Sequence, residues 1–234
     1  MTFFVCRRKV IINKGGDVTR IFIGSIKAIR QTGTPTGIYK EEVREPILCS
    51  LTGFTGDKQA DLSVHGGADK AIHYYPDRHY LELKQFFPEI IHELQPGSLG
   101  ENLSHHQFDE SNVHIGDVWQ IGQAFLQITQ PRHPCWKIDA KFETKGLTAF
   151  IVEQLLTGWY FKVLEPGLIC PDDNWVKVSS SNCRFTLKEV QHICRQHRPP
   201  IDDLDHICNA EGIAKRWSHT LVERVRWLES HPHS

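Results

Sequence analysis

The sequence lacks three patterns that would point directly to a function class. Its seven cysteines form no C-x-x-C pair, no apolar run is long enough to cross a bilayer, and the formal net charge is only -1. An odd number of scattered cysteines argues against a zinc ribbon and against a disulfide framework. Balanced charge gives no global electrostatic reason to bind nucleic acid. We therefore expect a cytoplasmic protein with neither a membrane nor a nucleic-acid partner.

The 234 residues allow one sizeable domain with a small one attached. Residues 21–180 contain short apolar runs at 21–29, 112–122 and 124–130, rich in β-branched and aromatic residues and separated by Gly and Pro. Spacing of this kind predicts a β-barrel or sandwich. Two helices are expected within it, over 76–87 and 146–157, so the predicted fold class is mainly β with helices.

Residues 181–234 are different, because three amphipathic helices are predicted there in succession. A capping box of Thr186 and Glu189 opens the first. Asp202 or Asp203 is the expected cap of the second and Gly212 its end. These helices predict a small C-terminal three-helix domain. Residues 1–20 fit neither part, and both an extra edge strand and a flexible extension remain open for them.

Residues 129–139, TQPRHPCWKID, surround a cysteine with basic side chains, since Arg132, His133 and Lys137 lie within three positions of Cys135. Neighbouring cations favour a thiolate. Arg132 suits bidentate recognition of phosphate, and Lys137 adds a point charge. The two prolines of the stretch are expected to end the strand that precedes it. Cys135 is thus a candidate reactive group or metal ligand.

Two glycine-rich stretches could carry a binding site. In residues 56–75, Gly66 and Gly67 would let backbone N–H groups approach a ligand, with His65 and Lys70 nearby to add positive charge. An anion site is one interpretation of this stretch, and a plain glycine turn is the other. The loop 96–104 contains Asn102, whose amide can both donate and accept hydrogen bonds.

Three other roles for Cys135 remain to be weighed. A zinc hydrolase could combine it with His65, His73 or His79, although none of them stands in an H-E-x-x-H arrangement. A cysteine hydrolase could use His133 as its base, but adjacent side chains on a strand point to opposite faces. A purely structural role in the core is the third alternative.

After Gly-Asp at 56–57, four separated stretches occur that together resemble the MOSC domain family, named for the C-terminal domain of molybdenum cofactor sulfurase, and in particular its YiiM-like subgroup. They are V-H-G-G-A-D-K-A-I-H-Y-Y-P (64–76), G-E-N-L (100–103), S-N-V-H-I-G-D (111–117) and Q-P-R-H-P-C-W-K (130–137). The similarity runs from about residue 21 to the C-terminus, and the appended helices match a small module of that subgroup. Residues 1–20 lie outside it.

The resemblance implies a MOSC-type β-barrel whose cleft binds a molybdopterin-type molybdenum cofactor, with Cys135 as metal ligand or persulfide carrier. His65, Gly66, Gly67, Lys70, Asn102, Arg132 and Lys137 would lie near that cofactor. The implied reaction is a detoxifying reduction of small N-hydroxylated compounds such as 6-N-hydroxylaminopurine. Because no flavin or iron-sulfur motif is visible, electrons would come from a separate donor protein. A sulfur carrier that uses a Cys135 persulfide is the alternative, pyridoxal phosphate binding is a further property implied for the family, and a monomer or homodimer is expected.

Overall fold

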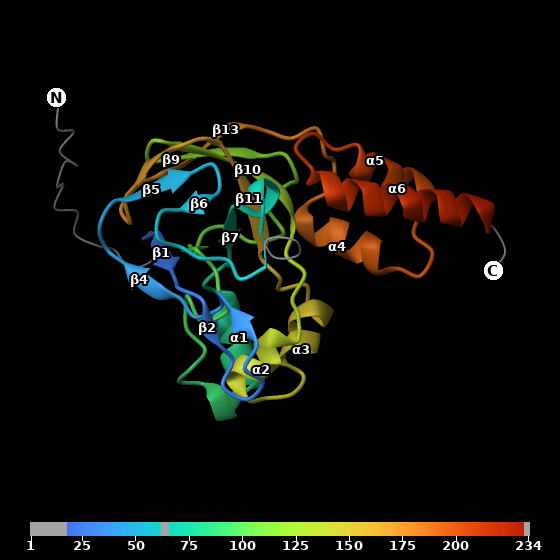
Figure 1. Ribbon diagram of the computed structural model, residues 1–234. Coiled ribbons are helices and arrows are strands. Elements are labelled where there is room, and N and C mark those ends of the chain that lie inside the picture. The colour runs from blue at the N-terminus through green and yellow to red at the C-terminus, as the bar shows by residue number, and fades with distance from the viewer. Residues whose placement is uncertain (1–17, 62–65, 232–234) are drawn as a thin grey trace.

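The structure, a computed structural model, describes residues 18–61 and 66–231. Its centre is an eight-stranded sheet that curls into a half-barrel, with β13 and β4 at its two edges (Figure 1). Its strands are β1 (Arg20–Ile23), β4 (Glu41–Val43), β7 (Ile72–Tyr74), β8 (Leu103–Ser104), β9 (Val118–Ile121), β10 (Ala124–Pro131), β11 (Trp159–Glu165) and β13 (Trp175–Ser179). The predicted class, mainly β with helices, is confirmed.

Two small sheets flank the large one. One joins β12 (Gly167–Ile169), β5 (Ile47–Ser50) and β6 (Gly53–Phe54), and the other joins β2 (Lys27–Ala28) to β3 (Pro35–Thr36). The expected strand over 21–29 is therefore divided between β1 and β2, and the run 112–122 forms a strand only at Val118–Ile121.

Helices lie in two groups (Figure 1). The first group contains α1 (His79–Phe86), α2 (Lys137–Phe142) and α3 (Leu147–Glu153). Two short 3-10 helices, η1 (Ala68–Lys70) and η2 (Pro88–Ile90), precede and follow α1 in the sequence. The second contains α4 (Leu187–Arg195), α5 (Ile201–Cys208) and α6 (Lys215–Ser230). The helices expected near 76–87 and 146–157 are present in shorter form, and the three C-terminal helices are confirmed. Helix α2 was not predicted.

The ends of the C-terminal helices correct part of the sequence analysis. The capping box of Thr186 and Glu189 is present as predicted. The prediction of an aspartate cap for α5 was wrong, because Pro200 is its N-cap and no side chain caps it. Asp202 and Asp203 lie instead in the first turn, where carboxylates interact favourably with the helix dipole. Helix α5 ends at Cys208, before Gly212.

One buried core joins the sheet to the C-terminal helices. Ile121 and Leu126 of the sheet belong to the same apolar cluster as Leu187 of α4 and Leu221 of α6. The division of the chain at residue 180 stays a prediction, and most of residues 1–20 lie outside the described residues. Within the described ranges, no helix has the length and apolarity needed to cross a membrane.

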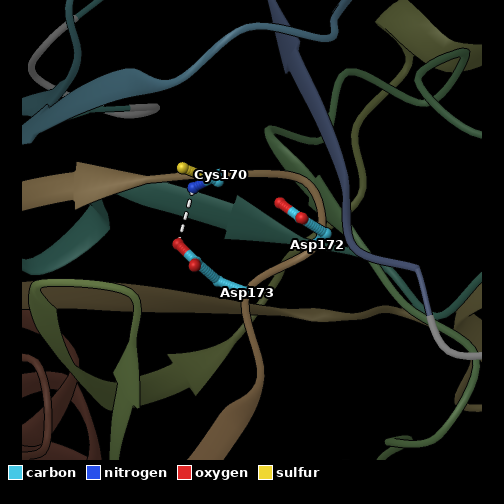
Figure 2. A group of neighbouring side chains, drawn as sticks. All are labelled: Cys170, Asp172 and Asp173. Atoms are coloured by element: carbon cyan, nitrogen blue, oxygen red, sulfur yellow. Dashed lines mark hydrogen bonds between the residues drawn. The ribbon is translucent and has the colours of Figure 1, made fainter. Parts of the chain in front are cut away.

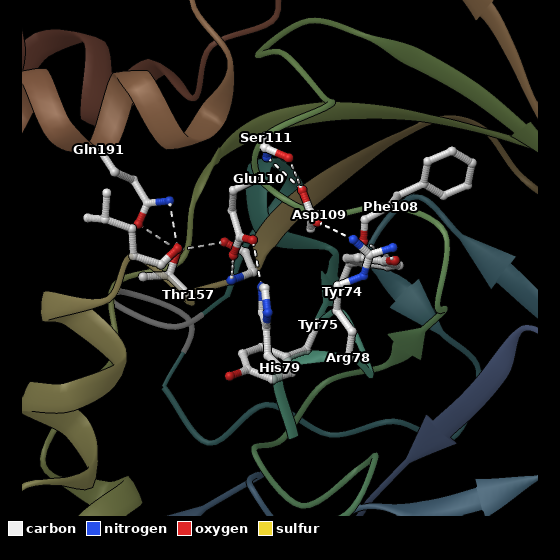
Figure 3. A network of polar contacts seen from close by, with 12 residues as sticks. Tyr74, Tyr75, Arg78, His79, Phe108, Asp109, Glu110, Ser111, Thr157 and Gln191 are labelled. Carbon is white, nitrogen blue, oxygen red and sulfur yellow. Dashed lines mark hydrogen bonds and ion pairs between the residues drawn. The ribbon is translucent and has the colours of Figure 1, made fainter. Parts of the chain in front are cut away.

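A buried polar chain ties α1 to the end of β10, and Figure 3 shows its first contact, between His79 and Glu110. His79 Nε2 lies 2.7 Å from Glu110 Oε2, and the other oxygen of Glu110 accepts a hydrogen bond from the backbone N–H of Gly158 at 2.6 Å. The carbonyl of Gly158 accepts in turn from the N–H of Arg132 at 3.0 Å. This chain fixes the backbone where the cysteine motif leaves the sheet.

Candidate functional site

Three adjacent strands present a row of polar side chains on one face of the sheet. Tyr160 of β11 is paired with His73 of β7 on one side and with Gln130 of β10 on the other. Because side chains alternate along a strand, directly paired residues share a face. The neighbouring residues Tyr74 and Trp159 belong instead to the apolar core, where their rings stack at 4.1 Å.

Five of the eight site residues predicted from sequence line one cleft, together with His73 and Tyr160 of this row. They are Lys70, Asn102, Arg132, Cys135 and Lys137. His73, Tyr160, Lys40 and Asp57 line the same cleft and were not among the predicted site residues.

Two of the other three predicted residues, Gly66 and Gly67, are not among the residues that line that cleft. Gly66 and Gly67 border a separate hollow that meets the cleft at Lys70. Gly67 has φ 91° and precedes η1, so it serves the turn there. His65 lies outside the described residues.

Cys135 lies in the connection between β10 and α2, half-buried at the cleft wall. Its carbonyl accepts hydrogen bonds from the N–H of Ile138 at 3.0 Å and from Thr148 Oγ1 at 3.3 Å, which anchor it to α2 and α3. Elsewhere, burial raises the pKa of Cys49 to about 12 and that of Cys194 to about 11. The six described cysteines form no disulfide with one another.

Arg132 brings a buried donor to the cleft. Its Nη2 donates to the carbonyl of Leu99 at 3.0 Å, whereas Nη1 is buried with no hydrogen-bond partner among the described residues. Burial raises the pKa of Tyr160, and the charge and hydrogen bond of Arg132 offset part of that effect. Since an unpaired buried guanidinium nitrogen is costly, the cleft is suited to a ligand that accepts from Nη1.

His73 brings a buried acceptor. Burial, followed by the charge of Arg132, holds its pKa well below the usual value, so the ring is neutral. The ring also bonds to the backbone of Gly100, an interaction that favours protonation, while Nε2 has no partner among the described residues. We infer that Nδ1–H donates to the Gly100 carbonyl and that Nε2 offers its lone pair.

A buried ion pair lies in the cleft wall. Lys40 Nζ is 2.5 Å from Asp57 Oδ1, and each side chain is only 4% exposed. Burial is the main cause that lowers the pKa of Lys40, while Asp57 opposes that shift. Asn102 Nδ2 donates to Asp57 Oδ2 at 2.9 Å and to the Phe22 carbonyl at 3.2 Å, and Asn102 Oδ1 accepts from the N–H of His73. Both hydrogen bonds that the Asn102 amide donates are therefore made within the protein.

The neighbouring residue of the G-E-N-L stretch is also structural. Glu101 is completely buried, and its carboxylate accepts hydrogen bonds from the N–H groups of Gly97 and Leu99 and from Tyr80 Oη. This carboxylate folds the loop that presents the Leu99 carbonyl to Arg132. The stretch therefore builds the cleft wall.

Among the described residues, the zinc-hydrolase alternative for Cys135 gains no geometric support. Cys170, Asp172 and Asp173 are the one grouping of three potential metal ligands found among the described residues, and it excludes Cys135 (Figure 2). Asp173 Oδ2 accepts from the N–H of Cys170 at 2.6 Å, so that carboxylate closes a turn. His79 is engaged with Glu110.

Comparisons with known proteins identify the family of the chain. Residues 61–176 match the model of the MOSC domain. The chain is 34% identical over 205 residues to the protein YiiM of Escherichia coli strain K12, covering 87% of this chain and 90% of that protein. It is 31% identical over 189 residues to YflK of Bacillus subtilis strain 168, covering 81% and 84%. A protein named a reductase from Gibberella moniliformis is 32% identical over 215 residues, which are 91% of this chain but 38% of that protein.

Solved structures show the same fold. YiiM from Escherichia coli superposes with a TM-score of 0.75 at 26% identity, covering 89% of this chain and 92% of that one. YiiM from Geobacillus stearothermophilus also gives 0.75, at 27% identity and with 88% and 97% covered. The chain therefore belongs to the MOSC domain family, as a YiiM-like member.

Proposed function

We propose that the protein is a molybdenum-cofactor-dependent reductase of small N-hydroxylated compounds and that Cys135 is the protein ligand of the metal. The observation that carries the proposal is one cleft that holds a half-buried cysteine together with the two unpaired buried atoms Arg132 Nη1 and His73 Nε2. The reductase name of one relative supports the reaction class.

The residues of the cleft fit a molybdopterin-type cofactor. Five basic side chains and two carboxylates line it, an excess that suits a terminal phosphate. Arg132 and Lys137 would hold that phosphate, and a thiolate is a soft ligand suited to a sulfur-bound metal. The His73 acceptor suits an N–H group at the edge of a pterin ring.

Three predicted contacts receive different roles in this proposal. Asn102 positions Asp57, and Gly66 and Gly67 shape the turn that places Lys70, so none of them need contact the cofactor. No observation supports pyridoxal phosphate binding or a detoxifying role.

When bound, the cofactor would supply two electrons for cleavage of the N–O bond. The balanced reaction converts R–NHOH, two electrons and two protons into R–NH2 and water, with the electrons drawn from a separate donor protein. The chain must therefore deliver protons. Lys40 suits this role because burial lowers its pKa and Asp57 holds its ammonium in the cleft wall. His133 also lines the cleft, but burial and the charges of Lys70 and Arg132 lower its pKa, which makes it the weaker proton source.

The test is expression in a host that makes molybdopterin, followed by metal analysis, pterin fluorescence and an assay with an aromatic hydroxylamine and a chemical reductant. Wild-type protein should contain close to one molybdenum per chain and reduce the substrate. Cys135→Ser should lose the activity, whereas Cys194→Ser, on a helix outside the cleft, should keep it. Wild-type protein that stays free of molybdenum and takes up no cofactor in vitro would refute the proposal.

A sulfur carrier is the second candidate, favoured by the half-buried position of Cys135 at a cleft wall. In this function the Cys135 thiolate would receive a sulfane sulfur from a donor persulfide and pass it on. Intact-mass analysis after incubation with a cysteine desulfurase should then show one added sulfur on wild type and none on Cys135→Ser. Equal addition to both proteins would count against this function.

A further inference from the structure

The cleft continues past Tyr160 into a second hollow bounded by helix α6. The two share Lys70, His133 and Tyr160, and the second is completed by Gln130, Arg216, Trp217 and Thr220. Gln130 and Tyr160 belong to the same sheet row as His73. A ligand could therefore lie along this row with one end near Cys135 and the other near α6.

The start of α6 is fixed to the sheet, so its side chains have a defined place. The N–H of Ala214 donates to the carbonyl of Thr129 at 3.1 Å, and the N–H of Lys215 donates to Asp69 Oδ2 at 3.1 Å. Thr129 Oγ1 donates to the carbonyl of Asp69 at 2.6 Å, which joins the two anchors. Arg216, the next residue, is thereby held at the hollow.

The hollow combines cations with aromatic rings. Burial lowers the pKa of Lys70, and the nearby charge of Arg216 lowers it further, against a weaker opposing effect of Asp69. Lys70 Nζ lies 5.6 Å from the ring centre of Tyr160, and the rings of His133 and Trp217 meet edge-on at 5.9 Å. A bound anion would stabilise the two like charges together, and a flat ring would find aromatic partners.

We propose that this hollow is a substrate subsite that binds the anionic group, a phosphate or carboxylate, of a planar ring-containing substrate. Lys70 and Arg216 bind the anion, while Tyr160 and Trp217 contact the ring. The N-hydroxyl end then points along the sheet row toward Cys135. The direction in which the N-hydroxyl end points rests on the proposed reductase function, but binding of the anionic group at the subsite does not.

Calorimetry on protein free of cofactor tests the binding directly, with phenyl phosphate, phenol and inorganic phosphate as probes. Phenyl phosphate should bind at least about tenfold more tightly than either of the others, because only it engages both cations and rings. Arg216→Gln should cost about tenfold in that affinity, and Trp217→Leu should weaken phenyl phosphate more than inorganic phosphate. Arg226→Gln, an exposed change on the same helix, should have no effect. Equal binding of phenol and phenyl phosphate, or an unaffected Arg216→Gln, overturns the proposal.

Kinetics on the loaded protein separates the subsite from the reaction. With an aromatic amidoxime and its para-carboxylate as substrates, Arg216→Gln should raise KM for the carboxylate alone and leave kcat unchanged. If neither compound is reduced while phenyl phosphate still binds as expected, the reductase function fails and the subsite stands. If Arg216→Gln instead lowers the molybdenum content, the hollow serves the cofactor and the subsite proposal is overturned.

Discussion

Asn102 Nδ2 donates a hydrogen bond to Asp57 Oδ2 at 2.9 Å, while the other oxygen of Asp57 binds Lys40 Nζ and the N–H of Gly24. Both oxygens of the carboxylate are therefore held from different parts of the chain. The same asparagine accepts from the N–H of His73. A single buried amide thus positions the ion pair and a strand of the cleft together, which makes it a support for the site.

Asn102→Ala should destabilise the protein by about 2–4 kcal/mol, because three buried hydrogen bonds are lost and their partners are left unsatisfied. Urea denaturation followed by circular dichroism measures the change. Asn112→Ala, an exposed position with only local bonds, should cost less than about 1 kcal/mol. Equal losses for the two variants would show that the Asn102 contacts do not carry this energy.

Arg132→Met should reduce the molybdenum content of protein from a molybdopterin-producing host far more than Lys137→Met. Arg132 is buried and has an unpaired nitrogen at the cleft, whereas Lys137 Nζ donates to the Pro35 carbonyl at 3.3 Å in an exposed setting. Loss of a buried charge-assisted bond should lower cofactor affinity by about tenfold or more. Metal analysis normalised to protein concentration checks the order, and a larger effect at Lys137 would contradict it.

His73 should stay a neutral ring at acidic pH values at which an exposed histidine becomes protonated. Its folded pKa lies well below 6.5, whereas the unfolded ring titrates near 6.5, so the unfolded state binds more protons in acid. Stability should therefore fall as the pH drops below about 6.5. His73→Phe should lose this part of the pH dependence, as measured by urea denaturation at several pH values.

Nitrogen-15 NMR of the histidine rings gives an independent check on His73. The His73 signals are identified as those that disappear in the spectrum of His73→Phe. They should show a protonated Nδ1 and an unprotonated Nε2, as expected if Nδ1 donates to the Gly100 carbonyl. The opposite tautomer would remove the acceptor from the cleft and with it the proposed contact to a ligand donor.

Short-range patterns in the sequence predicted the local elements well. The capping box at Thr186 and the apolar spacing of the last three helices are local signals, and both are confirmed. Helix α2 was missed because it has only six residues and follows a proline-rich turn, where periodicity cannot be recognised. The aspartate cap of α5 was misplaced by the same limit, since helix boundaries depend on backbone contacts.

The site was only partly predictable from the sequence for a different reason. Cys135 and Arg132 stand out because of their neighbours in sequence, but His73, Tyr160 and Lys40 join them only through strand pairing and chain packing. Asn102 was interpreted as a ligand contact because its amide looked available. Only the fold shows that Phe22 and Asp57 use its donors.

Glu110 offers the strongest test of how the fold supports the site from a distance. Glu110 is 2% exposed, and one of its carboxylate oxygens accepts a hydrogen bond from the N–H of Gly158 while the other contacts His79 Nε2. The carbonyl of Gly158 accepts in turn from the N–H of Arg132. Glu110→Ala leaves His79 Nε2 and the Gly158 N–H buried without a partner, so the free energy of unfolding should fall by about 3–5 kcal/mol. Glu110→Gln can keep both bonds through its amide and should lose much less.

The matched control is Glu189→Ala, which removes an exposed carboxylate of the capping box and should cost only about 1 kcal/mol. Chemical denaturation ranks the three variants, and metal analysis of the Glu110→Gln protein shows whether Arg132 is still in place. If Glu110→Ala proves no more costly than Glu189→Ala, the buried chain from α1 to Arg132 contributes little, and the cleft must be held by the sheet pairing alone.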